Sequence, residues 1–84
     1  MTKLRSDVVL RRLDDGAVLV DLDTNNIFEL NATGARICEL LATPTSNDDI
    51  VARLCEEFDV DADLAEGQLR ALVTDLEAEG LLSR

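Results

Sequence analysis

The sequence predicts a single small α+β domain, winged-helix-like in its order, with a three-stranded antiparallel sheet followed by three helices. Two observations carry this prediction. Apolar and polar residues alternate over the first third of the chain, which is typical of half-buried strands, and apolar residues recur at helical spacing over the remainder. Strands and helices are therefore segregated along the chain, which argues against a parallel βαβ arrangement.

Length and composition limit the class of protein. The 84 residues allow one modest core, and 46% of them are hydrophobic. No apolar run approaches the roughly 20 residues that a membrane-spanning helix requires, and no apolar segment of a secretory signal follows the basic start of the chain. We therefore expect a cytoplasmic domain of residues 8–84, without membrane contact, preceded by a flexible N-terminal arm of residues 1–7.

The strands are expected at residues 8–13, 17–22 and 27–30, joined by turns at 14–16 and 23–26. Gly16 is expected to supply a positive φ in the first turn, and an Asn the left-handed conformation in the second. The third strand completes an antiparallel meander, so that one of its edges is expected to be open. An open strand edge and a groove beside it are the predicted functional surface.

Alternation along the strands assigns their faces. Val18, Val20 and Leu22 share one face of the second strand, which is predicted to be the core side. On the third strand, Phe28 and Leu30 are predicted to point to the core, while Ile27 and Glu29 point the other way.

The helices are expected at residues 32–41, 47–58 and 62–79. Asn31 and Ser46 are suitable N-caps for the first two, and Asp61 or Asp63 for the third, because their side-chain oxygens can accept from unpaired amides of the first turn. Gly80 fits the position after the last turn, where a left-handed residue ends a helix and Leu81 can fold back as its hydrophobic contact.

The two cysteines and the absence of histidine limit the kinds of metal binding and catalysis that we expect. Cys38 and Cys55 match no metal or CxxC spacing and fall on apolar helix faces, so we expect two small buried thiols, with a disulfide or a reactive thiol as the alternative. Without His, transition-metal binding and His-based acid–base catalysis are disfavoured. We predict no catalytic residues, no metal, no cofactor and no enzymatic activity.

The protein is strongly acidic, with a formal net charge of −10 at pH 7. Such a surface repels phosphate backbones, which argues against nucleic-acid binding and favours a basic partner, unless the charges only keep the domain soluble.

At this point the sequence resembles a known family. The segment 18–22, a short turn, and Phe28-Glu29-Leu30-Asn31-Ala32-Thr33-Gly34-Ala35 are similar to the signature of the PqqD-like family of peptide-recognition elements. The segments 58–61 and 76–82 agree with it, so the resemblance spans about residues 8–82. Asp23-Thr24 stands where the proteins of quinone biosynthesis carry Pro-Glu, and residues 30–36 look more like discrete proteins of lasso-peptide clusters.

The resemblance implies a function. The family binds the leader segment of a ribosomally made precursor peptide as an added strand against the third strand, beside the third helix. It presents the precursor to a leader peptidase or another modifying enzyme and does no chemistry itself. The open edge also allows either a monomer or an edge-strand dimer.

The candidate peptide-binding residues come from the third strand and the third helix. Leu72 is the predicted groove wall; Leu69 and Leu76 either contribute to it or fill the core, and Gln68 and Asp75 form polar rims. Glu29 either pairs with a basic leader residue or is an ordinary solvated charge. The full set is Asn26, Ile27, Phe28, Glu29, Leu30, Gln68, Leu69, Leu72, Asp75 and Leu76.

Two other classes of protein share parts of this pattern. A winged-helix DNA-binding protein has the same order of elements, but its recognition helix would be basic, and the third helix here carries only Arg70 against several acids. An acidic carrier protein would need a serine at a helix start; Ser46 is available, but it lacks the usual Asp-Ser-Leu surroundings.

Overall fold

The computed structural model of the chain describes residues 3–43 and 45–83. Residues 1 and 2, the start of the expected flexible arm, and residues 44 and 84 lie outside the described part. The elements are β1 (Lys3–Leu4), β2 (Val8–Leu13), β3 (Gly16–Asp21), β4 (Ile27–Asn31), α1 (Ala32–Leu40), α2 (Asn47–Glu57), α3 (Ala62–Ala78) and β5 (Leu82–Ser83).

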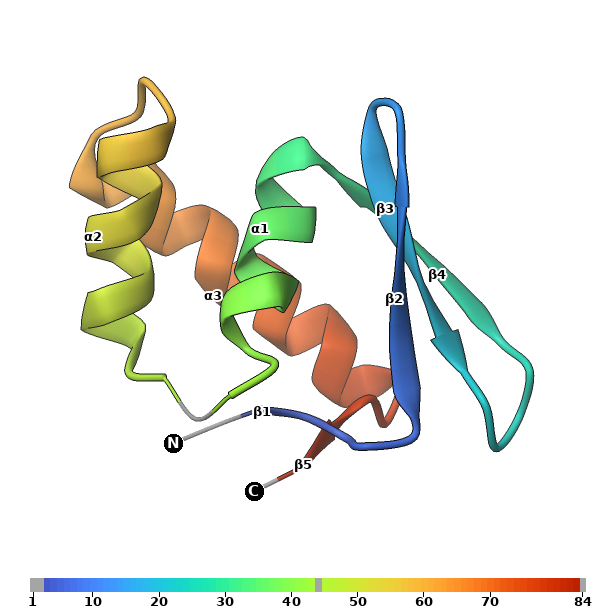
Figure 1. Cartoon of the computed structure of the whole chain (residues 1–84). Helices are drawn as coiled ribbons and strands as arrows, with labels where there is room; N and C mark the ends of the chain where they lie inside the picture. Colours follow the sequence, from blue (N-terminus) through green and yellow to red (C-terminus); the bar gives the residue numbers. More distant parts are fainter. Residues whose placement is uncertain (1–2, 44, 84) are drawn as a thin grey trace.

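The central sheet is antiparallel with the order β2-β3-β4, so β3 is its middle strand. Val18 of β3 pairs with Arg11 of β2 on one side and with Glu29 of β4 on the other. All three helices lie on the same side of this sheet, with α1 between the sheet and α2 (Figure 1). The predicted α+β class, with three sheet strands followed by three helices, is confirmed.

Local capping signals set the helix starts. Oδ1 of Asn31 accepts from the Gly34 amide at 2.7 Å, and the side chains of Ser46 and Asp61 cap α2 and α3 in the same way. Helix α3 ends in a Schellman motif: Gly80 has a φ of 72°, and the Leu81 amide donates to the Leu76 carbonyl. These predictions from the sequence are confirmed.

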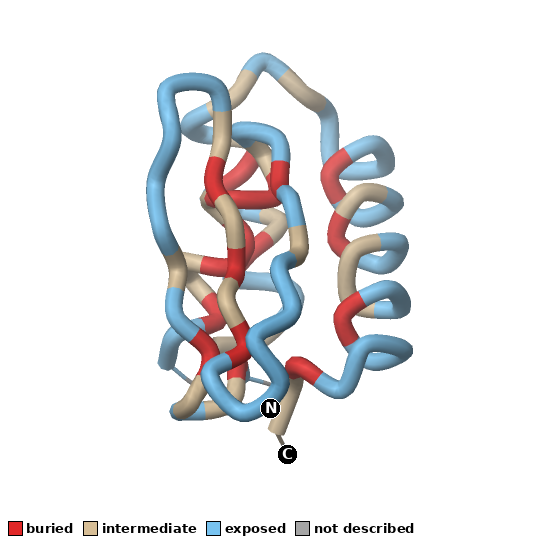
Figure 2. The backbone as a smooth tube through the Cα atoms, turned by 90° about the vertical axis from the view of Figure 1, so that its right-hand side faces the viewer, coloured by how far each residue is buried: buried red, intermediate tan, exposed pale blue. Residues whose placement is uncertain are grey.

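The core lies between the sheet and the helices (Figure 2). On β3, Ala17 and Leu19 are the buried apolar residues, whereas Leu22, just after β3, is 58% exposed. The predicted core face of Val18, Val20 and Leu22 is therefore wrong. Both faces of β3 are apolar, so alternation alone could not show which one the helices cover. On β4, Leu30 is buried and Phe28 half-buried on the helix side, as predicted.

Asp21 belongs to the covered face of β3 and is only 3% exposed. Its carboxylate accepts from the Arg5 guanidinium at 3.0 Å and from the Asp23 amide at 3.0 Å, so its charge is paired. Arg5 also donates to the Gly80 carbonyl and thereby joins the sheet to the end of α3.

The two short strands β1 and β5 pair antiparallel and bring the two ends of the chain together (Figure 1). Leu4 of β1 is buried, and its amide donates to the Leu41 carbonyl at 3.0 Å. Residues 3–7, expected to be part of a flexible arm, thus contact the body of the domain. The pairing joins segments almost a chain length apart and has no periodic sequence signal.

Gly16 does not have the positive φ expected for the first turn; among the described glycines only Gly80 does. The second turn is as predicted, because Asn25 has a φ of 63°. The reason for a glycine at position 16 is a close approach of two backbones, in which a Cβ would lie 2.1 Å from the Leu30 carbonyl oxygen.

Candidate functional site

The outer edge of β4 carries no strand within the described part of the chain. The Asn26 carbonyl accepts from the Asp21 amide, and the Leu30 carbonyl faces Gly16, so both point toward β3. Because the backbone groups of a strand alternate in direction, the amides and carbonyls of Ile27 and Glu29 point away from the sheet. This edge can accept a further strand.

A hollow of about 280 Å³ lies between this edge and α3. We call it the β4–α3 groove, and it is lined by Phe28, Glu29, Leu30, Asn31, Thr33, Gly34, Ile37, Gln68, Ala71, Leu72 and Asp75. It joins two segments that are distant in sequence, the β4–α1 junction and the middle of α3.

The groove has an apolar interior and an acidic border. Leu30 and Ile37 are buried, and Phe28 and Leu72 are half-buried beside them. Glu29 and Asp75 are the acidic residues among those that line the groove. Such a surface suits a guest with apolar side chains directed inward and basic groups at the border.

Gln68 adds a buried polar atom to the groove. Its Oε1 is shielded from solvent and accepts no hydrogen bond from any residue that the structure describes. A buried unpaired acceptor costs stability in the free protein, and such atoms deserve an explanation.

The structure brings together six of the ten predicted site residues: Phe28, Glu29, Leu30, Gln68, Leu72 and Asp75. Asn26, just before β4, and Ile27, the first residue of β4, are exposed but do not line the groove. Leu69 and Leu76 are buried at 2% and 0% exposure, so they fill the core, which was the other expectation for them.

Five groove residues were not among the predicted site residues: Asn31, Thr33, Gly34, Ile37 and Ala71. Ala71 could have been found, because it lies three residues after Gln68 and four before Asp75 on one helix face. The others belong to β4's last residue and α1, and the sequence carries no signal for how α1 turns toward α3.

A second hollow of about 270 Å³ lies between α2 and α3 on the other flank of α3. Val51 and Val73 supply apolar surface there, with Asp48, Glu66 and Arg70 around them. The two hollows are similar in volume, so volume does not show which of them is the functional site. Of these two hollows, the β4–α3 groove is the one that adjoins an open strand edge, whose main-chain groups can direct a guest backbone.

Among the described residues, the Cys38 thiol is buried in the core and the Ser46 hydroxyl is used as a helix cap. Burial raises the pKa of the Cys38 thiol to about 12, and both cysteines are free thiols. Oγ of Ser46, the attachment point that a carrier protein would need, caps α2 by accepting from the Asp49 amide at 3.2 Å.

Two further searches cover the same residues. No group of three His, Cys, Asp or Glu side chains in the described part is placed to hold a metal ion. Of the helices in that part, none has the length and apolar character needed to cross a bilayer.

The fold is a small α+β domain in which an open strand edge adjoins a groove. The family model described as "Coenzyme PQQ synthesis protein D (PqqD)" matches residues 16–82, and the chain belongs to this family. No curated protein matches the chain.

Two solved structures are similar over nearly the whole chain. One is TbiB1 in complex with the TbiA(beta) leader peptide, 36% identical, with a TM-score of 0.83 over 96% of this chain and 94% of that one. The other is a lasso peptide synthetase B1 complexed with the leader peptide, 31% identical, with a TM-score of 0.82 over 99% and 98%. Both contain a bound leader peptide.

Proposed function

We propose that this protein binds the leader segment of a ribosomally made precursor peptide as an added strand on β4, in the β4–α3 groove. It presents that precursor to a separate leader peptidase or modifying enzyme of a lasso-peptide pathway, in the cytoplasm, and performs no chemistry itself. The observation that carries the proposal is the open β4 edge beside an apolar groove, in a fold shared with two leader-peptide complexes.

Main-chain pairing gives the guest its direction and register but little affinity. Each hydrogen bond to the amides and carbonyls of Ile27 and Glu29 contributes about 0.5–1.5 kcal/mol net. Ordering a flexible peptide on the protein costs a comparable amount of free energy. Apolar burial against Phe28 and Leu72, at roughly 25 cal/mol per Å², supplies the surplus.

The test is the affinity of a fluorescently labelled leader from a precursor encoded beside this protein, measured by fluorescence polarisation. Leu72→Glu places a charge in the groove, and we expect binding to weaken at least tenfold, or about 1.4 kcal/mol. Leu64→Glu is the matched control, because Leu64 lies on the same helix, is 50% exposed and does not line the groove.

A second variant tests the strand edge. Ile27→Pro removes an amide that points away from β3, so the sheet keeps its pairing while a guest loses a donor. Circular dichroism should show folded protein, and leader binding should weaken. Unchanged leader affinity in both folded variants, Leu72→Glu and Ile27→Pro, would overturn the proposal.

A further inference from the structure

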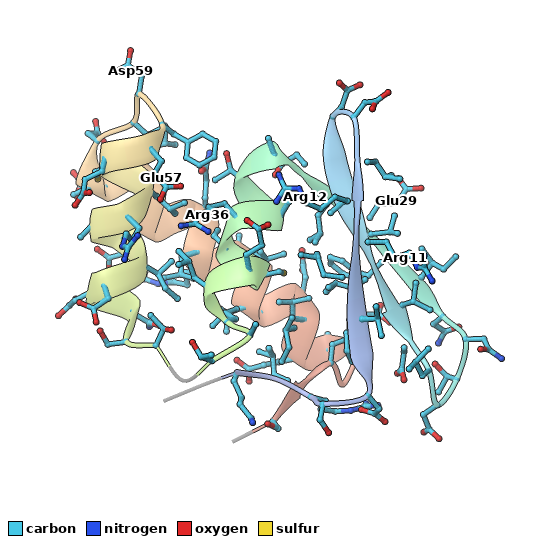
Figure 3. The ribbon with its side chains drawn as sticks, in the orientation of Figure 1. Arg11, Arg12, Glu29, Arg36, Glu57 and Asp59 are labelled. Atoms are coloured by element: carbon cyan, nitrogen blue, oxygen red, sulfur yellow. The ribbon has the colours of Figure 1, made fainter. Side chains whose placement is uncertain are left out.

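The uncovered face of the sheet carries a row of three side chains, Arg11, Val18 and Glu29, which lie in register across β2, β3 and β4. Figure 3 shows Arg11 and Glu29 on the side of the sheet away from the helices. Two strand spacings, about 10 Å, separate the two backbones, so Val18 stands between the opposite charges.

Neither Arg11 nor Glu29 makes an ion pair with another described residue, whereas the neighbouring Arg12 points to the helix side and pairs with Glu39 of α1. Glu29 is exposed and is the last member of its row before the open edge. A guest strand added to the open edge of β4 would place its own residue next in this row.

The register of β4 assigns a face to each residue of such a guest. Residues side by side on neighbouring strands point to the same face of a sheet. The guest residues beside Phe28 and Leu30 therefore enter the β4–α3 groove, and the residue between them lies beside Glu29 on the uncovered face.

We propose that β4 selects a guest segment with an apolar–basic–apolar triplet, in which the two apolar side chains enter the groove and a central Lys or Arg pairs with Glu29. The inference rests on the proposed function and adds to it the side-chain chemistry of the guest. The triplet is the same in both directions, so it holds for parallel and antiparallel addition.

Charge favours a basic residue in the central position. The nearest row neighbour of the guest is the Glu29 carboxylate, while the Arg11 guanidinium belongs to a strand two places farther away. The protein as a whole has a formal net charge of −10, which attracts a basic segment and repels an acidic one.

The experiment is a display selection of random peptides, each long enough to form one strand, against the full chain. Three proteins are used: the wild type, Glu29→Lys and Glu56→Lys. Glu56 is exposed on α2, away from β4, so the two variants change the net charge equally and only one changes it beside the guest.

For the wild type and Glu56→Lys we expect enrichment of apolar–basic–apolar triplets. For Glu29→Lys we expect an acidic residue at the centre. For one enriched peptide, exchange of its central Lys for Glu should weaken wild-type binding about two- to fivefold, the size expected of an exposed cross-strand charge pair. That exchange should strengthen binding to Glu29→Lys.

The negative outcomes separate the two proposals. Peptides that bind through apolar residues, lose affinity with Leu72→Glu and show no charge preference at the centre overturn the triplet while leaving strand addition in place. Selection of no peptide, or only of peptides indifferent to Leu72→Glu and Ile27→Pro, overturns the proposed function and the triplet with it.

Discussion

Gly16 of β3 and Leu30 of β4 approach so closely that a Cβ on Gly16 would lie 2.1 Å from the Leu30 carbonyl oxygen. The contact holds together the central strand and the strand that borders the groove. The neighbouring atoms are all backbone, so the strain of a side chain could not be relieved by a rotamer change. A methyl group here must separate the strands.

Gly16→Ala is therefore expected to destabilise the protein by about 1–3 kcal/mol, measured by urea unfolding. Gly67→Ala is the matched control, because a Cβ at Gly67 in α3 meets nothing within 4 Å. It should stabilise the protein by about 0.5–1 kcal/mol, since Ala is the better helix former. Equal stability of the two variants would contradict the close approach.

The two cysteines are expected to differ in reactivity. Because burial raises the pKa of Cys38 to about 12, its thiol stays protonated at pH 8 and does not react. Cys55 is partly exposed. An Ellman titration should find one reactive thiol in the folded wild type and none in folded Cys55→Ala. After unfolding in urea, the wild type should show two reactive thiols. Rapid reaction of a thiol in folded Cys55→Ala would be the contrary result.

The Arg5–Asp7 pair is expected to contribute stability that depends on pH. Arg5 donates to both carboxylate oxygens of Asp7 at 2.9 Å, and these hydrogen bonds hold the Asp7 pKa below its ordinary value of 3.8. A lowered pKa means that the stabilisation is present above the unfolded value and disappears as the pH falls through the folded one.

The measurement is the urea midpoint of Asp7→Asn and of the wild type as a function of pH. The variant should be less stable at pH 7, and the difference should shrink as the pH falls below about 4. Asp15→Asn, an exposed change in the β2–β3 turn, serves as the control. A difference between Asp7→Asn and wild type that stays constant with pH would rule out the ionic contribution.

Substitutions of Gln68 are expected to change the thermal stability of the protein without a bound peptide. Its Oε1 is shielded without a hydrogen bond, so Gln68→Met removes an unsatisfied acceptor, and we expect the melting temperature to stay the same or rise. Gln68→Glu would place a carboxylate in the same position and should lower it. A large loss of stability in Gln68→Met would show that the amide has a structural partner.

Features with a local cause could be predicted from the sequence. The caps at Asn31, Ser46 and Asp61 and the helix end at Gly80 depend on side chains and backbone within a few residues, and all are confirmed. About half of the residues that line the groove could be predicted for the same reason. Helical spacing puts Gln68, Leu72 and Asp75 on one side of α3, and alternation separates Phe28 from Glu29.

Features that depend on contacts between distant parts of the chain could not be predicted from the sequence. The core face of β3 was predicted wrongly because both of its faces are apolar, and the buried Asp21 is neutralised by Arg5, 16 residues earlier. The β1–β5 pair and the contribution of α1 to the groove depend in the same way on segments that meet only in the folded chain.

The sequence by itself determined the order of strands and helices, the capped helix ends and the family, because each depends on short-range patterns. Only the tertiary structure decided which face of the sheet is covered and that α1 completes the groove with α3. The physical reason is that one strand can bury either face equally well until helices from elsewhere in the chain cover one of them.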